Sequence, residues 1–192
     1  MTEIRKTRRA SSRNDILIHT PEVIYEMVLT GTLQGFPHGY WSSFDSTVNA
    51  SRCIRYLLEK VLNLSEKEIP EVYTVALLRK YKLYGMLVKV FNTNLHMSLD
   101  CAYKGKYKPY MLSKVPDGYW TEETIKEGVR WLIEEKLHMS KEQVKEQFST
   151  PFLHKYGFGS ILQGRSVFEV LDLAYPGEFN AWDLSCIGKG TD

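Results

Sequence analysis

The sequence has few of the residues that build disulfide frameworks and metal centres. Its 192 residues include three cysteines, Cys53, Cys101 and Cys186, which lie far apart and in no CxxC or Cys/His spacing. The five histidines form no HxxH or HxxxH pair. We therefore expect a reduced protein with no metal and no cofactor.

Long apolar runs are also missing. No stretch approaches the roughly 20 apolar residues that cross a bilayer, and the basic start, Met1 to Arg13, is not followed by the apolar core of a signal peptide. These absences predict a cytoplasmic protein that does not bind membranes. Hydrophobic residues make up 43% of the chain and aromatic residues 12%, so the chain can bury a core.

The strongest positive feature is an internal repeat. The motif PHGYW (37–41) recurs as PDGYW (116–120), and RYLLEKVLNLS aligns with RWLIEEKLHMS when Arg55 is set against Arg130, 75 positions later. KYKLYGML aligns with KYGFGSIL at the same offset. After a slip of three residues, LDCAYKGKYKPYML (99–112) aligns with LDLAYPGEFNAWDL (171–184).

The repeat predicts the organisation of the chain. The stretch before the first copy also ends in a Pro-x-Gly-Tyr-Trp motif, so we read it as a degenerate N-terminal partial repeat. We expect a basic flexible arm, this partial repeat or cap, a basic repeat 1, an acidic repeat 2 and a tail, at residues 1–13, 14–38, 39–115, 116–186 and 187–192.

Helix signals are clearest in the second repeat. Thr121 is placed to cap a helix that has Glu122 and Glu123 in its first turn. Ser140 and Gln143 have the spacing of a capping box, and Pro151 should interrupt or restart the helix that follows. The residues Ile125, Val129, Leu132 and Ile133 form an apolar stripe at helical spacing.

Shorter helices are predicted after these. In the second repeat they span 153–163 and 167–175, and in the first 75–91 and 95–103, with residues 92–94 as a turn. Two short helices joined by a tight polar turn and preceded by a longer helix have the outline of a helix-turn-helix. The fold class that we predict is all-α, with two tandem diverged helix-turn-helix-like repeats.

The motifs resemble known repeat families. GYWTEETIKEGVRWL, followed by KYGFGSILQGRSVFEVLDLAY, resembles the helix-turn-helix repeats found beside HNH and homing endonucleases. The ending YPGEFNAWDL resembles a GYW…AYPGxFxxWxL repeat family of Bacillus and its phages. This resemblance covers residues 39–184 and implies DNA binding. Because the spacing of residues assembles no catalytic cluster, the function that we predict is that of a non-catalytic DNA-binding protein, such as a phage or mobile-element regulator.

Charge distinguishes the two repeats. Residues 79–114 carry eight basic side chains and one acidic side chain, whereas the equivalent stretch 154–192 carries three basic and five acidic. Binding of phosphates releases counterions, so repeat 1 is the candidate for double-stranded DNA. A solvated lysine face is the alternative reading of the same segment. The candidate phosphate-binding lysines are Lys80, Lys82, Lys89, Lys104, Lys106 and Lys108.

Two further groups extend this DNA-binding hypothesis. The arm contributes Arg5, Lys6, Arg8, Arg9 and Arg13, which could lie in a minor groove or along phosphates. Helical spacing turns Leu95, Leu99 and Ala102 inward, matching Val167, Leu171 and Ala174. It leaves Asn94, His96, Met97 and Lys104 toward solvent, so Asn94 and His96, with Asn92 in the turn, are candidates for reading base edges.

The second repeat is assigned a different partner. Phe168, Glu169 and Asp172 occupy its corresponding helix face, where two carboxylates would repel phosphate, so we expect an oligomer contact or a host protein there. The alternative function is accordingly a protein-binding modulator or inhibitor of a host enzyme. It predicts an exposed apolar patch around Phe168 or Trp182 and binding that does not depend on salt.

Other interpretations are weaker. The aromatic positions Trp41, Trp120, Trp131, Phe179 and Trp182 recur in the repeat, which favours core packing over base stacking. Pro116, Asp117, Glu134 and Lys136 can be fitted to a PD…ExK nuclease pattern, but Glu134 and Lys136 fall in a predicted helix. GFGSILQG lacks the Lys and Ser/Thr of a phosphate loop. We expect no catalytic residues.

Overall fold

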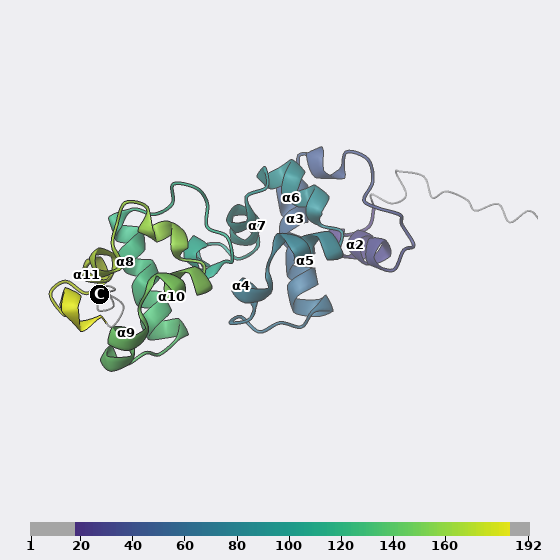
Figure 1. Cartoon of the computed structure of the whole chain (residues 1–192). Helices are drawn as coiled ribbons and strands as arrows, with labels where there is room; N and C mark the ends of the chain where they lie inside the picture. Colours follow the sequence, from purple (N-terminus) through teal and green to yellow (C-terminus); the bar gives the residue numbers. More distant parts are fainter. Residues whose placement is uncertain (1–17, 185–192) are drawn as a thin grey trace, which may run out of the picture. The chain divides into compact units, whose positions relative to one another are not determined.

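The computed structural model describes residues 18–184, and these form helices and turns with no strand (Figure 1). The chain divides into two compact units, with the division after Tyr107. This confirms the prediction of an all-α protein with two tandem repeats. The predicted basic arm (1–13) and tail (187–192) lie outside the described residues.

In its described part, from residue 18 to 107, the first unit contains one leading helix and one repeat. The leading helix is α2 (Pro21–Leu29). The repeat then follows in the order η1 (Tyr40–Ser42), α3 (Ser46–Arg55), η2 (Tyr56–Val61), α4 (Ile69–Val72), α5 (Val75–Lys80), α6 (Tyr84–Phe91) and α7 (Leu95–Ala102).

The second unit repeats most of this order without a leading helix. It begins with a single turn of 3-10 helix in place of α2. Its elements are η3 (Pro109–Met111), α8 (Glu122–Arg130), η4 (Trp131–Lys136), α9 (Lys141–Gln147), α10 (Thr150–Lys155), η5 (Gly159–Leu162), α11 (Val167–Ala174) and η6 (Ala181–Asp183).

The longest helix of each repeat ends in the same unusual way. Helix α3 passes into the π-helical segment η2, and α8 passes into η4 at the equivalent position. The Leu62 amide donates to the Leu57 carbonyl over 2.9 Å, and the Leu137 amide to the Leu132 carbonyl over 3.1 Å. Both helices end at a left-handed residue, Asn63 or His138. Because π segments are rare, their recurrence shows that the two repeats share local geometry as well as sequence.

The core of each unit forms where its last helix crosses its longest helix. Helix α7 packs on α3, and α11 packs on α8. Ile125, Val129 and Leu132 are fully buried and Ile133 is 3% exposed, so the predicted stripe is confirmed. Burial of these side chains supplies the main favourable free energy of folding.

The predicted helix starts in the second unit are also confirmed. The hydroxyl oxygen of Thr121 accepts a hydrogen bond from the Thr124 amide at the start of α8. Ser140 and Gln143 form a reciprocal capping box at the start of α9. Pro151 lies in the first turn of α10, where its missing amide proton costs nothing, so the chain restarts a helix there.

The predicted helices 75–91 and 153–163 are wrong in one respect, because each is broken in the middle. Lys82 and Gly157 adopt left-handed backbone conformations with φ of 60° and 81°. The amide of the next residue, Leu83 or Phe158, donates to the carbonyl five residues back over 2.8 Å. This Schellman pattern ends a helix when the apolar residue after the turn can be buried, as both are here.

The boundary between the units differs from the predicted boundary after residue 115. Residues 108–115 belong to the second unit, and Tyr110 is buried in its core. The leading helix α2 belongs to the first unit and is not separate from it. The Tyr25 hydroxyl donates to the Tyr81 carbonyl over 2.8 Å, and Lys82 donates to the Val28 carbonyl over 3.1 Å.

Four of the five aromatic positions assigned to the core are buried or partly buried. Trp41, Trp120 and Trp131 are partly covered, and Phe179 is 6% exposed. The prediction is wrong for Trp182, whose side chain is 80% exposed. Within residues 18–184, no helix has the length and apolar character needed to cross a membrane.

Candidate binding surfaces of the two repeats

One polar arrangement joins the longest and last helices in the first unit. The Arg55 Nε atom donates to the Ala102 carbonyl at the end of α7 over 2.7 Å, and its guanidinium lies 4.9 Å from the centre of the Tyr103 ring. The Tyr103 hydroxyl donates to a Glu59 carboxylate oxygen over 2.8 Å. An arginine at a helix C-terminus satisfies an open carbonyl and favours the helix dipole.

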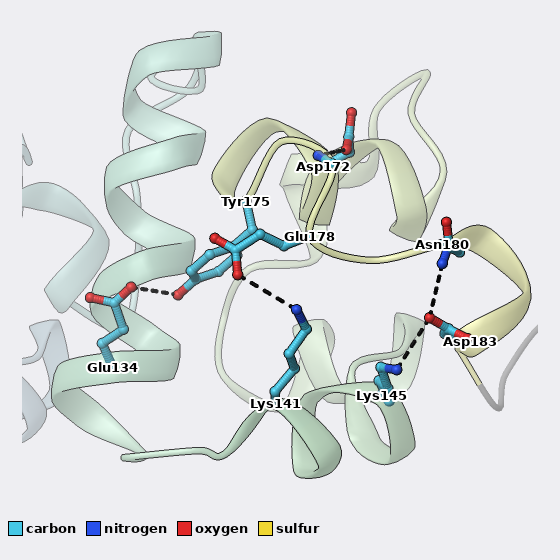
Figure 2. Close-up of polar contacts among 9 residues, drawn as sticks. Glu134, Lys141, Lys145, Asp172, Tyr175, Glu178, Asn180 and Asp183 are labelled. Carbon is cyan, nitrogen blue, oxygen red and sulfur yellow. Dashed lines mark hydrogen bonds and ion pairs between the residues drawn. The ribbon is translucent and has the colours of Figure 1, made fainter.

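The second unit contains the same arrangement, of which Figure 2 shows the hydrogen bond between Tyr175 and Glu134. The Arg130 Nε atom donates to the Ala174 carbonyl over 2.8 Å, and the Tyr175 hydroxyl donates to Glu134 over 2.8 Å. Burial is the main cause that raises the pKa of Tyr175. The two repeats therefore share one frame of polar contacts between the longest and last helices.

The Asp172 carboxylate, predicted to bind a partner, has a structural contact. It accepts a hydrogen bond from the Gly177 amide over 3.0 Å, and Asp100 accepts from the Gly105 amide over 2.7 Å in the first unit. Both glycines have positive φ, so each carboxylate fixes the tight turn that follows the last helix. The presence of both bonds shows that this aspartate serves the fold in both repeats.

Two ion pairs lie at equivalent positions of the repeats, but their positive and negative residues are exchanged. Lys106 pairs with Glu66 in the first unit. In the second unit Glu178 occupies the position of Lys106 and pairs with Lys141 over 3.8 Å (Figure 2). The fold thus tolerates either sign in the loop after the last helix, provided that the partner changes too.

Several predicted DNA-binding residues are occupied by contacts inside the first unit. The Asn94 side chain caps α7 by accepting from the Met97 amide over 2.9 Å, and a His96 ring nitrogen bonds the Tyr107 carbonyl over 2.9 Å. Lys82 donates to Val28, and Lys106 is ion-paired. Asn94 and His96 are only partly exposed, so the expectation that they are free to read base edges is not met.

The remaining candidates are exposed. Asn92 ends α6 in a left-handed conformation with φ of 46°. Lys80 lies at the end of α5, 5.4 Å from the centre of the Tyr81 ring, and Lys89 lies in the last turn of α6. Lys104 and Lys108 lie in the loops after α7. The predicted arm residues Arg5, Lys6, Arg8, Arg9 and Arg13 lie outside the described residues.

The surface of α7 does not have the character expected of a recognition helix. Leu95, Leu99 and Ala102 turn inward, as predicted. Its outward positions carry Met97, which is 55% exposed, and Asp100. Helix α7 has no lysine or arginine, so it offers little to base edges, and the lysines that could contact DNA lie in other helices, turns and loops.

In the second unit, the predicted partner-binding residues differ in role. Glu169 forms a capping box at the start of α11, where its carboxylate accepts from the Ser166 amide over 2.6 Å. This backbone hydrogen bond lowers the pKa of Glu169. Phe168 is partly buried and lines a mainly apolar hollow of about 660 Å³, together with Ser149, Thr150, Pro151, Ser166, Val167, Ala181 and Leu184.

Trp182 projects from a segment that is fixed on both sides. Phe179 and Leu184 are buried, and the Lys141 ammonium lies 5.1 Å from the centre of the Phe179 ring. Asp183 accepts from Asn180 over 3.3 Å and pairs with Lys145 over 3.2 Å (Figure 2). The segment that carries the exposed Trp182 is therefore held in place by its neighbours, with Ala181 at the edge of the hollow.

Sequence reasoning missed a second, polar hollow in the first unit. It measures about 330 Å³ and is lined by Pro21, Ile24, Pro37 and Gly39 and by the polar residues His19, His38, Tyr40, Ser43, Asp45 and Asn49. Burial raises the pKa of Tyr40 strongly, and its hydroxyl has no hydrogen-bond partner. Because α2 supplies one wall, the hollow depends on contacts between residues far apart in sequence, which no local motif reveals.

The residues of the weak nuclease pattern do not gather. Glu134 accepts from Tyr175 and lies in η4 with Lys136, while Asp117 is an exposed turn residue. In the described part of the chain, no group of three or more His, Cys, Asp or Glu side chains is placed to hold a metal ion. That the chain is not an enzyme stays a prediction.

Comparison with known proteins identifies one family. A family model described as "Protein of unknown function (DUF4046)" matches residues 22–108 and again residues 102–180. No curated protein and no solved structure matches the chain. Each match includes the segment ahead of the PxGYW motif, so the family unit agrees better with the structural units than with repeats that start at that motif. The chain belongs to the DUF4046 family, whose unit it contains twice in tandem.

Proposed function

We propose that the chain is a non-catalytic binding protein whose first repeat contacts the phosphate backbone of double-stranded DNA. The observation that carries this proposal is that the repeats differ in surface charge while they share one frame. At the positions of Lys82, Lys104 and Lys106 the second repeat has Gly157, Pro176 and Glu178.

The fold uses Lys82, which donates to the Val28 carbonyl, but it does not require a positive side chain at the position of Lys106. The reversed ion pairs, Lys106 with Glu66 and Glu178 with Lys141, show that the fold accepts a loop of either sign after the last helix. Both repeats also keep the arginine contact to the end of that helix. A positive first repeat is therefore better explained by a partner with negative charge than by a need of the fold.

The contacts of the candidate residues indicate the mode of binding. Base readout needs free polar side chains on one element that enters a groove. Asn94 and His96 are occupied, and the outward face of α7 carries Met97 and Asp100. Exposed lysines such as Lys80, Lys89 and Lys104 suit phosphate contacts, which position a protein on DNA without reading its sequence. We therefore expect binding with little sequence preference.

The test is fluorescence anisotropy with a labelled random duplex at several salt concentrations. The wild type should bind at low salt and weaken as salt increases. The triple variant Lys80→Gln, Lys89→Gln and Lys104→Gln should bind at least tenfold more weakly. Its dependence of log Kd on log salt should become shallower by up to about 3, since each lost phosphate contact removes roughly 0.9 from the slope.

A matched control removes the same charge elsewhere. Lys60, Lys67 and Lys155 are exposed lysines outside the proposed contact, and their triple change to Gln should lower affinity by less than threefold. Equal losses in the two triple variants would mean that net charge alone attracts DNA and that no binding face exists. Absence of salt-dependent binding by the wild type would end the proposal.

A further inference from the structure

Trp182 is highly exposed, although residues on either side of it in the same segment are buried. Its side chain is 80% exposed, whereas Phe179 and Leu184 on either side of it are buried at 6% and 1% exposure. Asp183 is held by Lys145 and Asn180. Large aromatic side chains presented on a fixed segment beside an apolar hollow are typical of protein contacts.

The first repeat shows what this position does when another repeat follows. Tyr110 is the counterpart of Trp182 at the 72-residue offset, and both lie in the middle of a short 3-10 helix, η3 or η6. Each short helix follows a buried aromatic residue, Tyr107 or Phe179. Tyr110, however, is only 8% exposed, because it is packed into the core of the second unit.

The acceptor of Tyr110 is the aromatic residue that begins the π-helical segment. The ring centre of Tyr110 lies 5.6 Å from that of Trp131, the first residue of η4. In the first unit the equivalent residue is Tyr56, whose ring centre lies 6.1 Å from that of Tyr25 in α2. In each repeat, the aromatic residue that begins the π-helical segment is therefore covered by an aromatic side chain from the segment that precedes the repeat.

Residues 18–184 thus contain two covered acceptors and one uncovered donor. Tyr25 covers Tyr56 and Tyr110 covers Trp131, while Trp182 occupies the position that covers the next repeat. We propose that Trp182 is the docking residue for a further repeat of this same fold, one whose π-segment aromatic is uncovered. This inference does not depend on the DNA-binding proposal.

The geometry also fixes what the partner must supply. Leu184, two residues after Trp182, lines the hollow together with Phe168 and Val167. The partner should present an aromatic ring to Trp182. Because its own acceptors are covered, the wild-type chain should not bind itself head to tail, and it should remain monomeric unless an acceptor is opened.

An acceptor can be opened in the full chain. The double variant Tyr110→Ala and Trp182→Ala should carry an uncovered Trp131 and no donor of its own. In analytical ultracentrifugation it should form a one-to-one complex with the wild-type chain, and the complex should weaken at least tenfold when the added chain carries Trp182→Ala. A folded double variant, shown by circular dichroism, that binds both chains equally or neither would overturn the proposal.

A second construction covers the case in which that acceptor does not fold. Residues 1–184 are followed directly by a second copy of residues 113–192, so that Trp182 takes the place of Tyr110 ahead of a new Trp131. Trp182→Ala should lower the melting temperature of this extended protein by several degrees and leave that of the original chain within one degree. Equal shifts in the two proteins would show that Trp182 does not dock on a following repeat.

Discussion

Lys106 and Glu178 occupy the same place in the two repeats and carry opposite charges, and each is paired with a residue of the opposite sign. Lys106 pairs with Glu66, and Glu178 pairs with Lys141. Glu66 and Lys141 are themselves equivalent at the 75-residue offset. The two repeats have therefore kept an interaction while exchanging its partners, which requires the same backbone geometry in both.

This relationship predicts that the pair in the first repeat can be reversed. Lys106→Glu alone sets two carboxylates against each other and should lower the melting temperature by roughly 1–3 °C, because exposed pairs contribute little. Adding Glu66→Lys should recover most of the loss. Thermal unfolding of the two single variants and the double variant measures the coupling. A double variant less stable than both single variants would contradict an exchangeable pair.

A buried polar pair in the first repeat gives a second prediction. The Tyr73 hydroxyl lies 2.8 Å from the Ser98 hydroxyl, and Ser98 also donates to the Leu95 carbonyl over 2.7 Å. Both side chains are fully buried, and the second repeat has Phe148 and Val170 at these positions. Ser98→Ala should cost about 1–3 kcal/mol, because it leaves the Tyr73 hydroxyl buried without a partner.

The second change in the same pair separates this cause from loss of volume. Tyr73→Phe should cost less than Ser98→Ala, because Ser98 keeps its bond to Leu95. In the double variant the unpaired hydroxyl is gone, so its stability should exceed that expected from adding the two single losses. Chemical denaturation measures all four proteins. Additive losses would mean that the two hydroxyls do not act as a pair.

How much of the fold could be predicted from the sequence depends on how far apart in the chain the interacting residues lie. The capping residues Thr121 and Ser140 and the stripe that begins at Ile125 were predicted correctly, because a cap and a helical period involve neighbours within one or two turns. The breaks at Lys82 and Gly157 were missed. A lysine in a left-handed conformation gives no local signal, and the break depends on burial of the following Leu83 or Phe158.

The candidate sites show the same limit more strongly. Composition identified the lysine-rich segment, but it could not show that Lys106 pairs with Glu66 or that His96 bonds the Tyr107 carbonyl. Analogy within the repeat predicts that Trp182 lies in the core, and this prediction is wrong for a physical reason. Tyr110 has a following repeat to pack against, and Trp182 has none among the described residues.

Two glycines allow a paired prediction about packing. A side chain at Gly128 would place Cβ 3.0 Å from the Trp120 ring and 3.1 Å from the Phe158 ring, whereas one at Gly85 would meet nothing within 4 Å. Gly128→Ala should therefore destabilise the fold by about 1–2 kcal/mol despite the better helix propensity of alanine. Gly85→Ala should stabilise it by about 0.5 kcal/mol. Urea unfolding of both variants separates steric crowding of the new methyl group from the gain in helix propensity. Equal changes in the free energy of unfolding would exclude crowding at Gly128.

The segment that carries Trp182 should respond to acid. The hydrogen bond from Lys145 lowers the pKa of Asp183 below its ordinary value of 3.8, with burial acting in the opposite direction and Asn180 adding a second bond. A carboxylate with a lowered pKa in the folded state stabilises that state fully above its unfolded pKa. The contribution is lost as the pH falls through the folded pKa.

We therefore expect stability to fall below about pH 4 in the wild type, with part of that fall due to Asp183. Asp183→Asn should remove this part, so the difference in stability between wild type and variant should be larger at pH 6 than at pH 3. Lys145→Ala should also remove most of the pH dependence of stability that is due to Asp183. Adding Asp183→Asn to Lys145→Ala should then change that pH dependence little. Urea unfolding from pH 2.5 to 7 gives these values. A wild-type and Asp183→Asn difference that is constant across this range would show that the Lys145 contact does not stabilise the loop.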